Sequence, residues 1–204
     1  MMPWGGRQQA IVTGSSDGAL RRWTLAGNLS QERYGTGRDV VSKLGRSIQA
    51  LVPWDEKLVV AAGERVVVLD ESFNILAEAT VGQKINAMCV LSPQTVAVAG
   101  QDLLGEVNLA SGAFTRTVSV PSKTEYVAVA PLGGDIVAAA TAKGEVRAVS
   151  LRSGQELGEF ETDFPVRGLS LSGKALLAFG GAWRVDGKAV ASLLWEVAEA
   201  QPDP

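Results

Sequence analysis

The residue types that most often carry out catalysis are scarce in this chain of 204 residues, which contains no histidine and a single cysteine, Cys89. Without histidine the chain lacks the Ser-His-Asp and Cys-His arrangements of nucleophilic catalysis. It also lacks the commonest ligand sets for zinc and iron. Any catalysis would therefore rest on Asp, Glu, Lys or Tyr side chains or on a bound cofactor.

Two further ligand-binding patterns, a phosphate-binding loop and a calcium-binding loop, are not supported by the sequence. Segment Tyr34–Ser47 contains Gly35, Gly37 and Gly45, but no Gly-Lys-Ser/Thr sequence occurs and no helix is predicted to follow, so a phosphate-binding loop is not expected. No acidic cluster has the spacing of a calcium-binding loop. We therefore expect no catalytic, cofactor-binding or metal-binding residues and no bound cofactor, and the chain is predicted not to be an enzyme.

One pattern of two short strands around a Gly-, Asp- or Glu-containing turn recurs five times along the chain. The copies are Ile11–Leu25, Leu58–Asp70, Val96–Leu109, Ile136–Leu151 and Ala175–Val197. The second strand ends in a Trp or an aliphatic residue, at Trp23, Leu69, Val107, Val149 and Trp195, with spacings of 46, 38, 42 and 46 residues. A period near forty built of short strands is typical of a β-propeller.

The sequence predicts an all-β fold, a β-propeller of about five four-stranded antiparallel blades. We expect one propeller over residues 1–197, with repeats at about 9–33, 48–80, 85–120, 125–161 and 166–197, and a C-terminal tail over 198–204. Both end blades are expected to be incomplete. Little chain precedes Gln9, and the seven residues after Val197 include two prolines, which pair poorly in a strand. An open edge is therefore expected between the first and fifth blades.

Two segments resemble a known repeat family. Thr13–Leu25 (TGSSDGALRRWTL) resembles a WD-repeat, and Leu193–Val197 (LLWEV) is similar, with Glu196 where the family usually has Asp. The resemblance implies a propeller that serves as a docking platform without catalysis of its own. The Gly-His pair of the family is missing, so apolar packing is expected to hold the blades together.

A second, partial resemblance covers Gly144–Phe160, which is similar to the repeats of quinone-dependent dehydrogenase propellers. The cofactor residues of that family are missing here. The shared propeller geometry accounts for the similarity, and no quinone is expected.

Two connections exceed the length of the repeat, Tyr34–Ser47 after the first blade and Gly180–Lys188 within the fifth. Both connection types open on the same face of a propeller, so the two loops are predicted to meet beside the seam. They offer aromatic anchors and positive charge, which suit an acidic protein partner. The alternatives are a solvated insertion for the first loop and a Trp folded back on its own blade for the second. The predicted partner-binding residues are Tyr34, Arg38, Lys43, Arg46, Trp183 and Arg184.

Composition limits the possible surroundings and partners of the chain. A formal net charge of −3 gives no electrostatic reason to expect nucleic acid or an anionic membrane as a partner. Residues Met1–Gly6 do not read as a secretory signal. In the long uncharged run Ile85–Gln101, residues Ser92, Pro93, Gln94 and Thr95 indicate two strands and a turn instead of a membrane span. A cytoplasmic location is expected.

Two further side chains are predicted to be structural. Cys89 lies in an apolar run and is expected to be a small core residue. Trp54 is followed by Asp55 in a literal Trp-Asp pair that falls at the wrong place in the repeat, so a turn with a half-buried ring is expected.

The expected function is that of a non-enzymatic scaffold for protein–protein interactions, as an oligomer or as a subunit of a larger complex. One alternative is a small-molecule-binding, glycan-binding or hydrolytic five-bladed propeller with carboxylates at its axis. Glycosidic hydrolysis needs paired carboxylates, and Glu125 is the one acid near the start of a predicted innermost strand. A second alternative is a fragment of a larger propeller.

Overall fold

The computed structural model describes residues 2–4, 10–24, 29–33, 44, 46–116, 118–180 and 192–196. All nineteen elements whose bounds it gives in this part of the chain are β-strands. They form five antiparallel sheets, each built from consecutive strands. The predicted all-β propeller architecture is therefore confirmed.

Each sheet is one blade. The first holds β1 (Met2–Trp4), β2 (Ala10–Gly14), β3 (Leu20–Thr24) and β4 (Leu29–Arg33). The second holds β5 (Ile48–Trp54), β6 (Lys57–Ala62), β7 (Arg65–Leu69) and β8 (Ile75–Thr80). The third holds β9 (Ile85–Ser92), β10 (Thr95–Gly100), β11 (Leu103–Asn108) and β12 (Phe114–Arg116). The fourth holds β13 (Tyr126–Gly133), β14 (Ile136–Thr141), β15 (Glu145–Ser150) and β16 (Glu156–Glu161). The fifth holds β17 (Val166–Ser172), β18 (Ala175–Gly180) and β19 (Ser192–Glu196).

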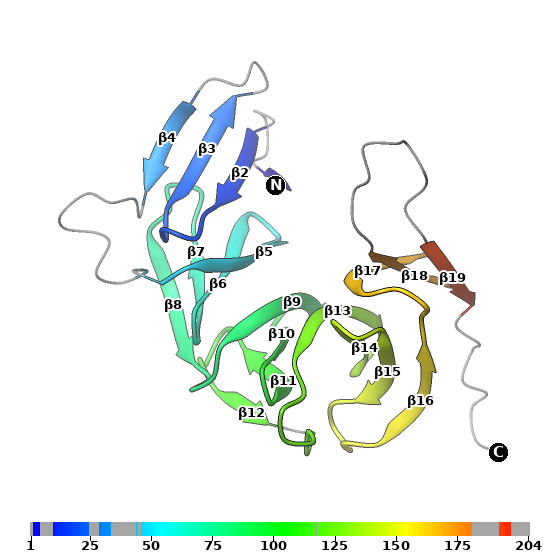
Figure 1. Cartoon of the computed structure of the whole chain (residues 1–204). Helices are drawn as coiled ribbons and strands as arrows, with labels where there is room; N and C mark the ends of the chain where they lie inside the picture. The colour runs from blue at the N-terminus through cyan, green and yellow to red at the C-terminus, as the bar shows by residue number, and fades with distance from the viewer. Residues whose placement is uncertain are drawn as a thin grey trace, which may run out of the picture.

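The five blades follow one another around an axis, and the first and fifth stand apart at the two ends of an open arc (Figure 1). Contacts between blades run through neighbouring strands near the axis, from β1 and β2 to β5, then to β9, β13 and β17. One expectation about the ends was wrong. Met2–Trp4 pairs with β2, so the first blade has four strands. The fifth sheet has three in the described part of the chain.

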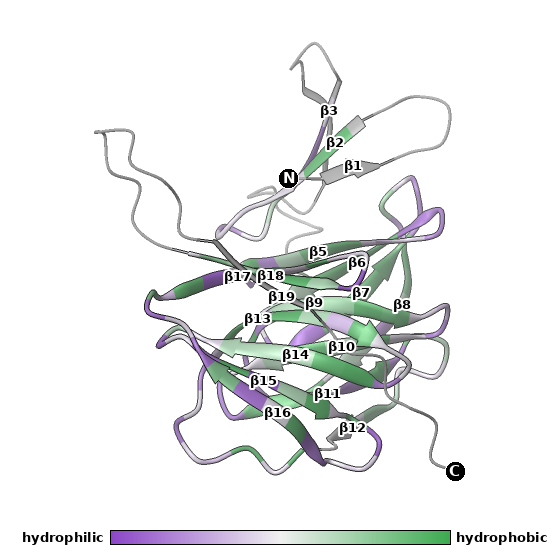
Figure 2. Ribbon diagram, turned by 90° about the vertical axis from the view of Figure 1, so that its right-hand side faces the viewer, coloured by the Kyte–Doolittle hydropathy of each residue, from purple (hydrophilic) through white to green (hydrophobic). Residues whose placement is uncertain are grey.

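Alternate residues of the second strand in a blade face opposite neighbours. In β10, Val96 and Val98 pack with residues of the second blade, whereas Ala97 and Ala99 pack with residues of the fourth. All four are fully buried. Coverage on both faces explains why these strands read as continuous apolar runs, and Figure 2 shows apolar residues along the stacked strands.

The aliphatic residues at the Trp position of the repeat face the preceding blade. Leu69 belongs to the core between the first and second blades, Val107 to that between the second and third, and Val149 to that between the third and fourth. Each is at most 3% exposed. This position therefore fixes one blade on the one before it.

The chain entering each new blade is hydrogen-bonded to the turn between the second and third strands of the preceding blade. The amide of Ile48 donates to the carbonyl of Ser15 at 3.0 Å, and the amide of Ile85 donates to the carbonyl of Gly63 at 2.8 Å. The amide of Thr162 donates to the carbonyl of Gly144 at 2.9 Å. Linkers and turns therefore share one face of the arc in this part of the chain.

A β-bulge recurs near the start of the innermost strand of four blades. The register shifts there, so that one residue has no partner on the second strand. Such a bulge aims its extra side chain away from the regular ladder. The bulged residues are Gln49, Asn86, Val127 and Arg167.

Candidate partner-binding surfaces

Arg46 is the one predicted partner-binding residue within the described part of the chain. It is exposed and lies between the turns of the first two blades. A Cβ built on Gly18 would lie 3.1 Å from the carbonyl oxygen of Arg46, and one built on Gly63 would lie 3.0 Å from its Cβ. The guanidinium group is thus carried on the face shared by linkers and turns. Five predicted residues lie outside the described residues: Tyr34, Arg38, Lys43, Trp183 and Arg184.

The bulged residue Asn86 connects two blades. Its Nδ2 atom donates to the main-chain carbonyl of Tyr126 at 3.0 Å and to Oε1 of Glu125 at 3.3 Å, both belonging to the fourth blade. At the same position in the second blade, Oε1 of Gln49 accepts a hydrogen bond from the amide of Gly63 at 3.0 Å. The bulge therefore turns a polar side chain into a clamp near the axis.

The fifth blade ends the arc with an apolar face. Leu177 and Phe179 lie on β18 at positions opposite to Leu176 and Ala178, which pack into the core with the fourth blade. Phe179 is 43% exposed. The equivalent residue is an alanine in the three preceding blades, and each of these alanines is fully buried under the next blade: Ala61, Ala99 and Ala140.

The ring of Phe179 covers the neighbouring strand. It lies over Gly168 of β17, where a Cβ atom would collide with the ring. Gly168 directly follows the bulged residue Arg167, which is exposed. Arg167 makes no ion pair or side-chain hydrogen bond with another described residue. The end of the fifth blade therefore combines an apolar platform with an arginine.

At the other end of the arc, the first blade presents the face that in later blades packs against the preceding blade. Trp23 pairs in register with Ile11 and is half-buried, and its Nε1 atom donates to Oγ1 of Thr13 at 2.9 Å. The position of Trp23 in the repeat is the one that faces the preceding blade elsewhere. Its partial exposure is explained by its place at the start of the arc.

Two groups outside these surfaces have structural roles. Burial raises the pKa of the Cys89 thiol to about 12, so the thiol is a core group, as its apolar surroundings predicted. Trp54 is half-buried, as predicted. Its Nε1 atom donates to the carbonyl of Pro93 at 2.9 Å, and Nζ of Lys57 lies 4.5 Å from the ring centre.

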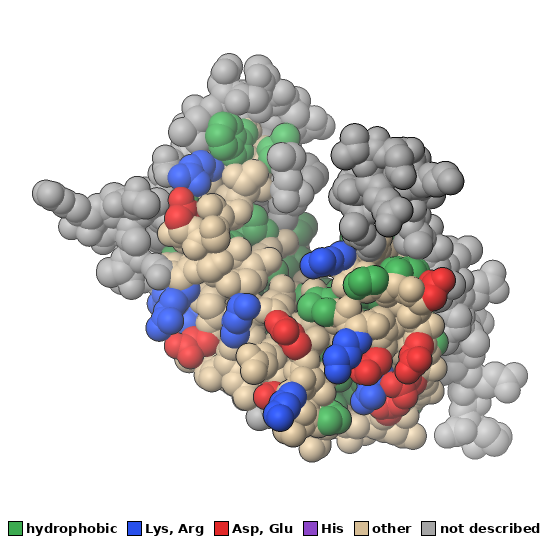
Figure 3. All heavy atoms as spheres, in the orientation of Figure 1, with side chains coloured by type: hydrophobic (Ala, Val, Ile, Leu, Met, Phe, Trp, Pro, Cys, Tyr) green, Lys and Arg blue, Asp and Glu red, His purple; other side chains and the backbone are tan. Residues whose placement is uncertain are grey.

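A charged cluster lies on the outer strands of the fourth blade. Nη2 of Arg147 lies 3.0 Å from Oε1 of Glu159, and Nη1 lies 3.6 Å from Oε2 of Glu156. Figure 3 shows acidic side chains gathered over this part of the surface. The arrangement ties β15 to β16 in the manner of a charged outer strand.

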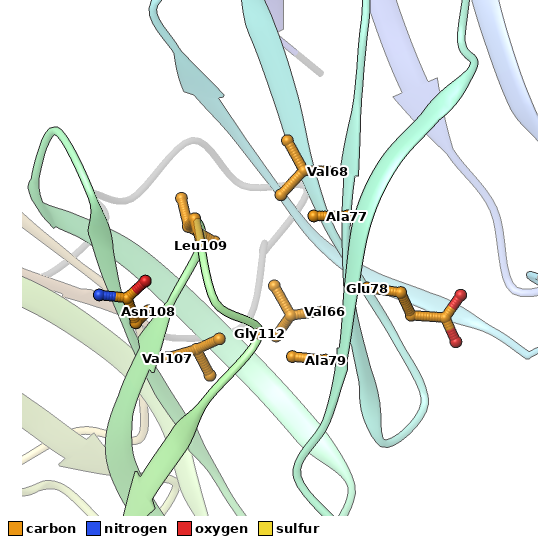
Figure 4. Close-up of a pocket in the computed structure, with 9 residues that line it drawn as sticks. All are labelled: Val66, Val68, Ala77, Glu78, Ala79, Val107, Asn108, Leu109 and Gly112. Carbon is orange, nitrogen blue, oxygen red and sulfur yellow. The ribbon is translucent and has the colours of Figure 1, made fainter.

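A shallow apolar crevice separates the second and third blades at their outer side (Figure 4). Val66, Val68 and Val107 line it, and its two polar side chains are used elsewhere. Glu78 pairs with Arg65 at 3.0 Å, and Oδ1 of Asn108 accepts two turn amides. No polar groups converge in the crevice, so it is a packing seam between blades.

The residues that the structure describes contain no group of side chains arranged to hold a metal ion. No three His, Cys, Asp or Glu side chains there are grouped as metal ligands would be. Glu125, the one acid predicted near the axis, accepts from Asn86. Within the same ranges, no helix has the length and apolar character needed to cross a membrane.

Sequence reasoning missed the polar and apolar groups at the open end of the fifth blade. A signal was present for Phe179, because it interrupts a column of alanines when the second strands are aligned. Arg167 could have been found in the same way, at the second residue of the innermost strand. Asn86 carried no signal, since its role depends on a bulge.

No family model and no curated protein matches the chain. Solved structures do match. The Neurospora crassa Pan2 WD40 domain superposes with a TM-score of 0.72 at 12% identity, over 95% of this chain and 61% of that one. The β-propeller domain of Myceliophteria thermophila Cps50 (Swd1) superposes with a TM-score of 0.66 at 18% identity, over 91% of this chain and 67% of that one.

The chain thus spans about three fifths of the Pan2 domain and two thirds of the Cps50 domain. At these identities the likeness concerns the fold. It agrees with the strand order, the interblade cores and the WD-like turn at Asp17, whose Oδ1 accepts from the amide of Ala19 at 2.8 Å. The chain has the fold of a WD40-like β-propeller.

Proposed function

We propose that the chain is a non-enzymatic propeller scaffold that binds protein partners in the cytoplasm as a subunit of a larger complex. Its primary partner-binding site is the loop face, formed by Tyr34, Arg38, Lys43, Arg46, Trp183 and Arg184. The proposal follows the sequence prediction, and the fold is that of the WD40 propellers to which the chain is similar.

The observation that carries this proposal is the hydrogen bonding between linkers and turns. In successive blades the linker and the preceding turn lie together, as with Ile85 and Gly63 or Thr162 and Gly144. The two enlarged loops are one linker and one such turn, so the pattern supports placing them on the same face. The exposed position of Arg46 between two turns also supports a basic surface there.

The composition of the loop face suits an acidic partner. Positive charges at the rim of an interface mainly increase the association rate. Aromatic anchors such as Trp183 supply much of the binding energy. The partner is therefore expected to bind faster at low salt, with its affinity dependent on Trp183.

The test uses the full chain purified with its stoichiometric partner from its own cells. Trp183→Ala should weaken partner binding by about 30-fold, equivalent to roughly 2 kcal/mol, with a nearly unchanged Tm. Trp54→Ala is the matched control, because that ring packs between blades. It should lower Tm and leave the affinity unchanged. A large loss of stability with unaltered affinity for Trp183→Ala would contradict the proposal, as would isolation of the chain without any partner.

A further inference from the structure

Within the arc, the third blade meets the fourth through two kinds of contact. Small residues on its second strand are buried beneath the following blade, as Ala97 and Ala99 are beneath the fourth. Near the axis, the bulged residue Asn86 reaches Tyr126 and Glu125 of the following blade. These contacts show what the third blade presents to its successor.

The fifth blade presents the same two positions with different side chains. Leu177 and Phe179 replace the buried small residues, and Arg167 replaces the bulged amide. Figure 3 shows hydrophobic side chains at the surface over β13 and β17, next to a basic side chain. Leu177 and Phe179 offer a larger apolar surface to a following strand, and the guanidinium group of Arg167 adds a positive charge.

We propose that this end of the fifth blade accepts a β-sheet from a partner polypeptide, with an apolar face over Leu177 and Phe179 and a carboxylate paired with Arg167. The contact of Asn86 supplies the pattern, since it meets a main-chain carbonyl and the carboxylate of Glu125. A guanidinium donates several hydrogen bonds in a fixed fork and pairs best with a carboxylate. The partner strand therefore carries an acidic residue near its start.

The extent of the arc argues against a second copy of the chain as the occupant. The chain superposes on 61% and 67% of two propeller domains, so 39% and 33% of those chains have no counterpart here. Two copies of such an arc would exceed one full ring. Closure of the arc on itself would have to bring together ends that stand apart in Figure 1. An added sheet with a carboxylate facing Arg167 fits this end of the fifth blade.

This surface lies at the end of the arc and differs from the loop face described under the proposed function. The inference extends that function to a second contact, and the two tests use different residues. Failure at Arg167 leaves the Trp183 experiment unaffected.

The probe is a synthetic peptide with the sequence of Thr124–Gly133, the chain's own innermost strand that Asn86 recognises. It is titrated into the full chain while the backbone amides and the Arg167 side chain are followed by NMR. The expected shifts are confined to Arg167, Gly168, Leu177 and Phe179. Arg167→Gln should weaken binding about tenfold or more, because a charge-assisted hydrogen bond is lost. A Glu125→Gln peptide should lose as much, and the two changes together should lose little more.

Arg152→Gln is the matched control, since Arg152 is exposed on another blade, and it should bind the peptide as the unaltered chain does. Equal binding by Arg167→Gln and the unaltered chain would overturn the proposal. So would the absence of binding at millimolar peptide. Light scattering measures whether the chain forms a dimer. A dimer that Phe179→Ser abolishes would assign this face to a second copy and would also overturn the proposal.

Discussion

Nδ2 of Asn86 lies 3.0 Å from the main-chain carbonyl oxygen of Tyr126, and the two residues belong to different blades. The contact exists because a bulge removes Asn86 from the regular ladder of its own sheet. The sequence lacks the histidines on which WD-repeats usually rely. Apolar cores, linker amides and this side-chain amide join the third and fourth blades instead.

Asn86→Ala should lower the free energy of unfolding by about 1–2 kcal/mol, because the interblade hydrogen bonds to Tyr126 and Glu125 are both lost. Hydrogen exchange should accelerate in β13, across the interface. Asn108→Ala is the matched control, since Asn108 accepts amides within a single turn, and it should affect exchange only near that turn. If both variants leave β13 equally protected, the clamp has no role in joining the blades.

Trp23→Ala should cost less stability than Leu69→Ala, although tryptophan is the larger residue. Leu69 is fully buried between blades, and deleting such a leucine typically costs about 2–5 kcal/mol. Trp23 is half-buried at the end of the arc. Urea unfolding of the two variants gives the comparison. A larger loss for Trp23→Ala would show that another part of the molecule covers its face.

Asp135 should stabilise the fold in a pH-dependent way. The Ser150 hydroxyl donates to Oδ2 of Asp135 at 2.6 Å, and this bond holds the pKa of the carboxyl below its usual value, aided by the amide of Arg152. A lowered folded pKa stabilises above the unfolded value of about 3.9, and the contribution is lost as pH falls through the folded pKa.

Asp135→Asn should therefore cost up to about 1 kcal/mol at pH 7, a modest value because the side chain is only half-buried and solvent screens its interactions. The difference from the unaltered chain should shrink below about pH 4. In a Ser150→Ala background the same substitution should have a smaller effect. A difference that stays constant between pH 7 and pH 3 would contradict the assignment of Ser150 as the main cause.

Cys89 should be inert toward thiol reagents in the native protein. Its pKa is raised to about 12 by burial, and the thiolate is the reactive form. Labelling with a disulfide reagent at pH 8 should therefore proceed at the rate of opening or unfolding and should follow the urea transition. Rapid labelling without urea would show that the third and fourth blades are not packed as described.

Most of the fold could be predicted because each blade is a local structure. The copies of the two-strand pattern predicted at Leu58–Asp70 and Ile136–Leu151 coincide with β6 and β7 and with β14 and β15. Met2–Trp4 was missed because a strand of three residues has no readable alternation, and its identity as a strand depends on pairing with β2. Long-range pairing of that kind is not written in the local sequence.

The candidate sites were harder to predict, because their roles depend on which face of a blade is covered. Trp23 and Leu69 occupy the same position of the repeat, and each is a large apolar residue at the end of a short strand. One is half-buried and the other fully buried only because of their places in the arc. Similarly, Arg167 is an ordinary strand residue until the bulge and the end of the arc are known.

The central claim is that the five blades form an open arc whose end faces are available to a partner. The most direct test is cross-linking of cysteine pairs with a short bismaleimide in a Cys89→Ala background. The pair Thr13→Cys and Phe179→Cys spans the two end faces, and the pair Asn86→Cys and Glu125→Cys spans an interface already in contact. The account predicts an intramolecular cross-link in the second pair and none in the first. Equally efficient cross-linking within a monomer for both pairs would contradict it, because the ring would then close on itself.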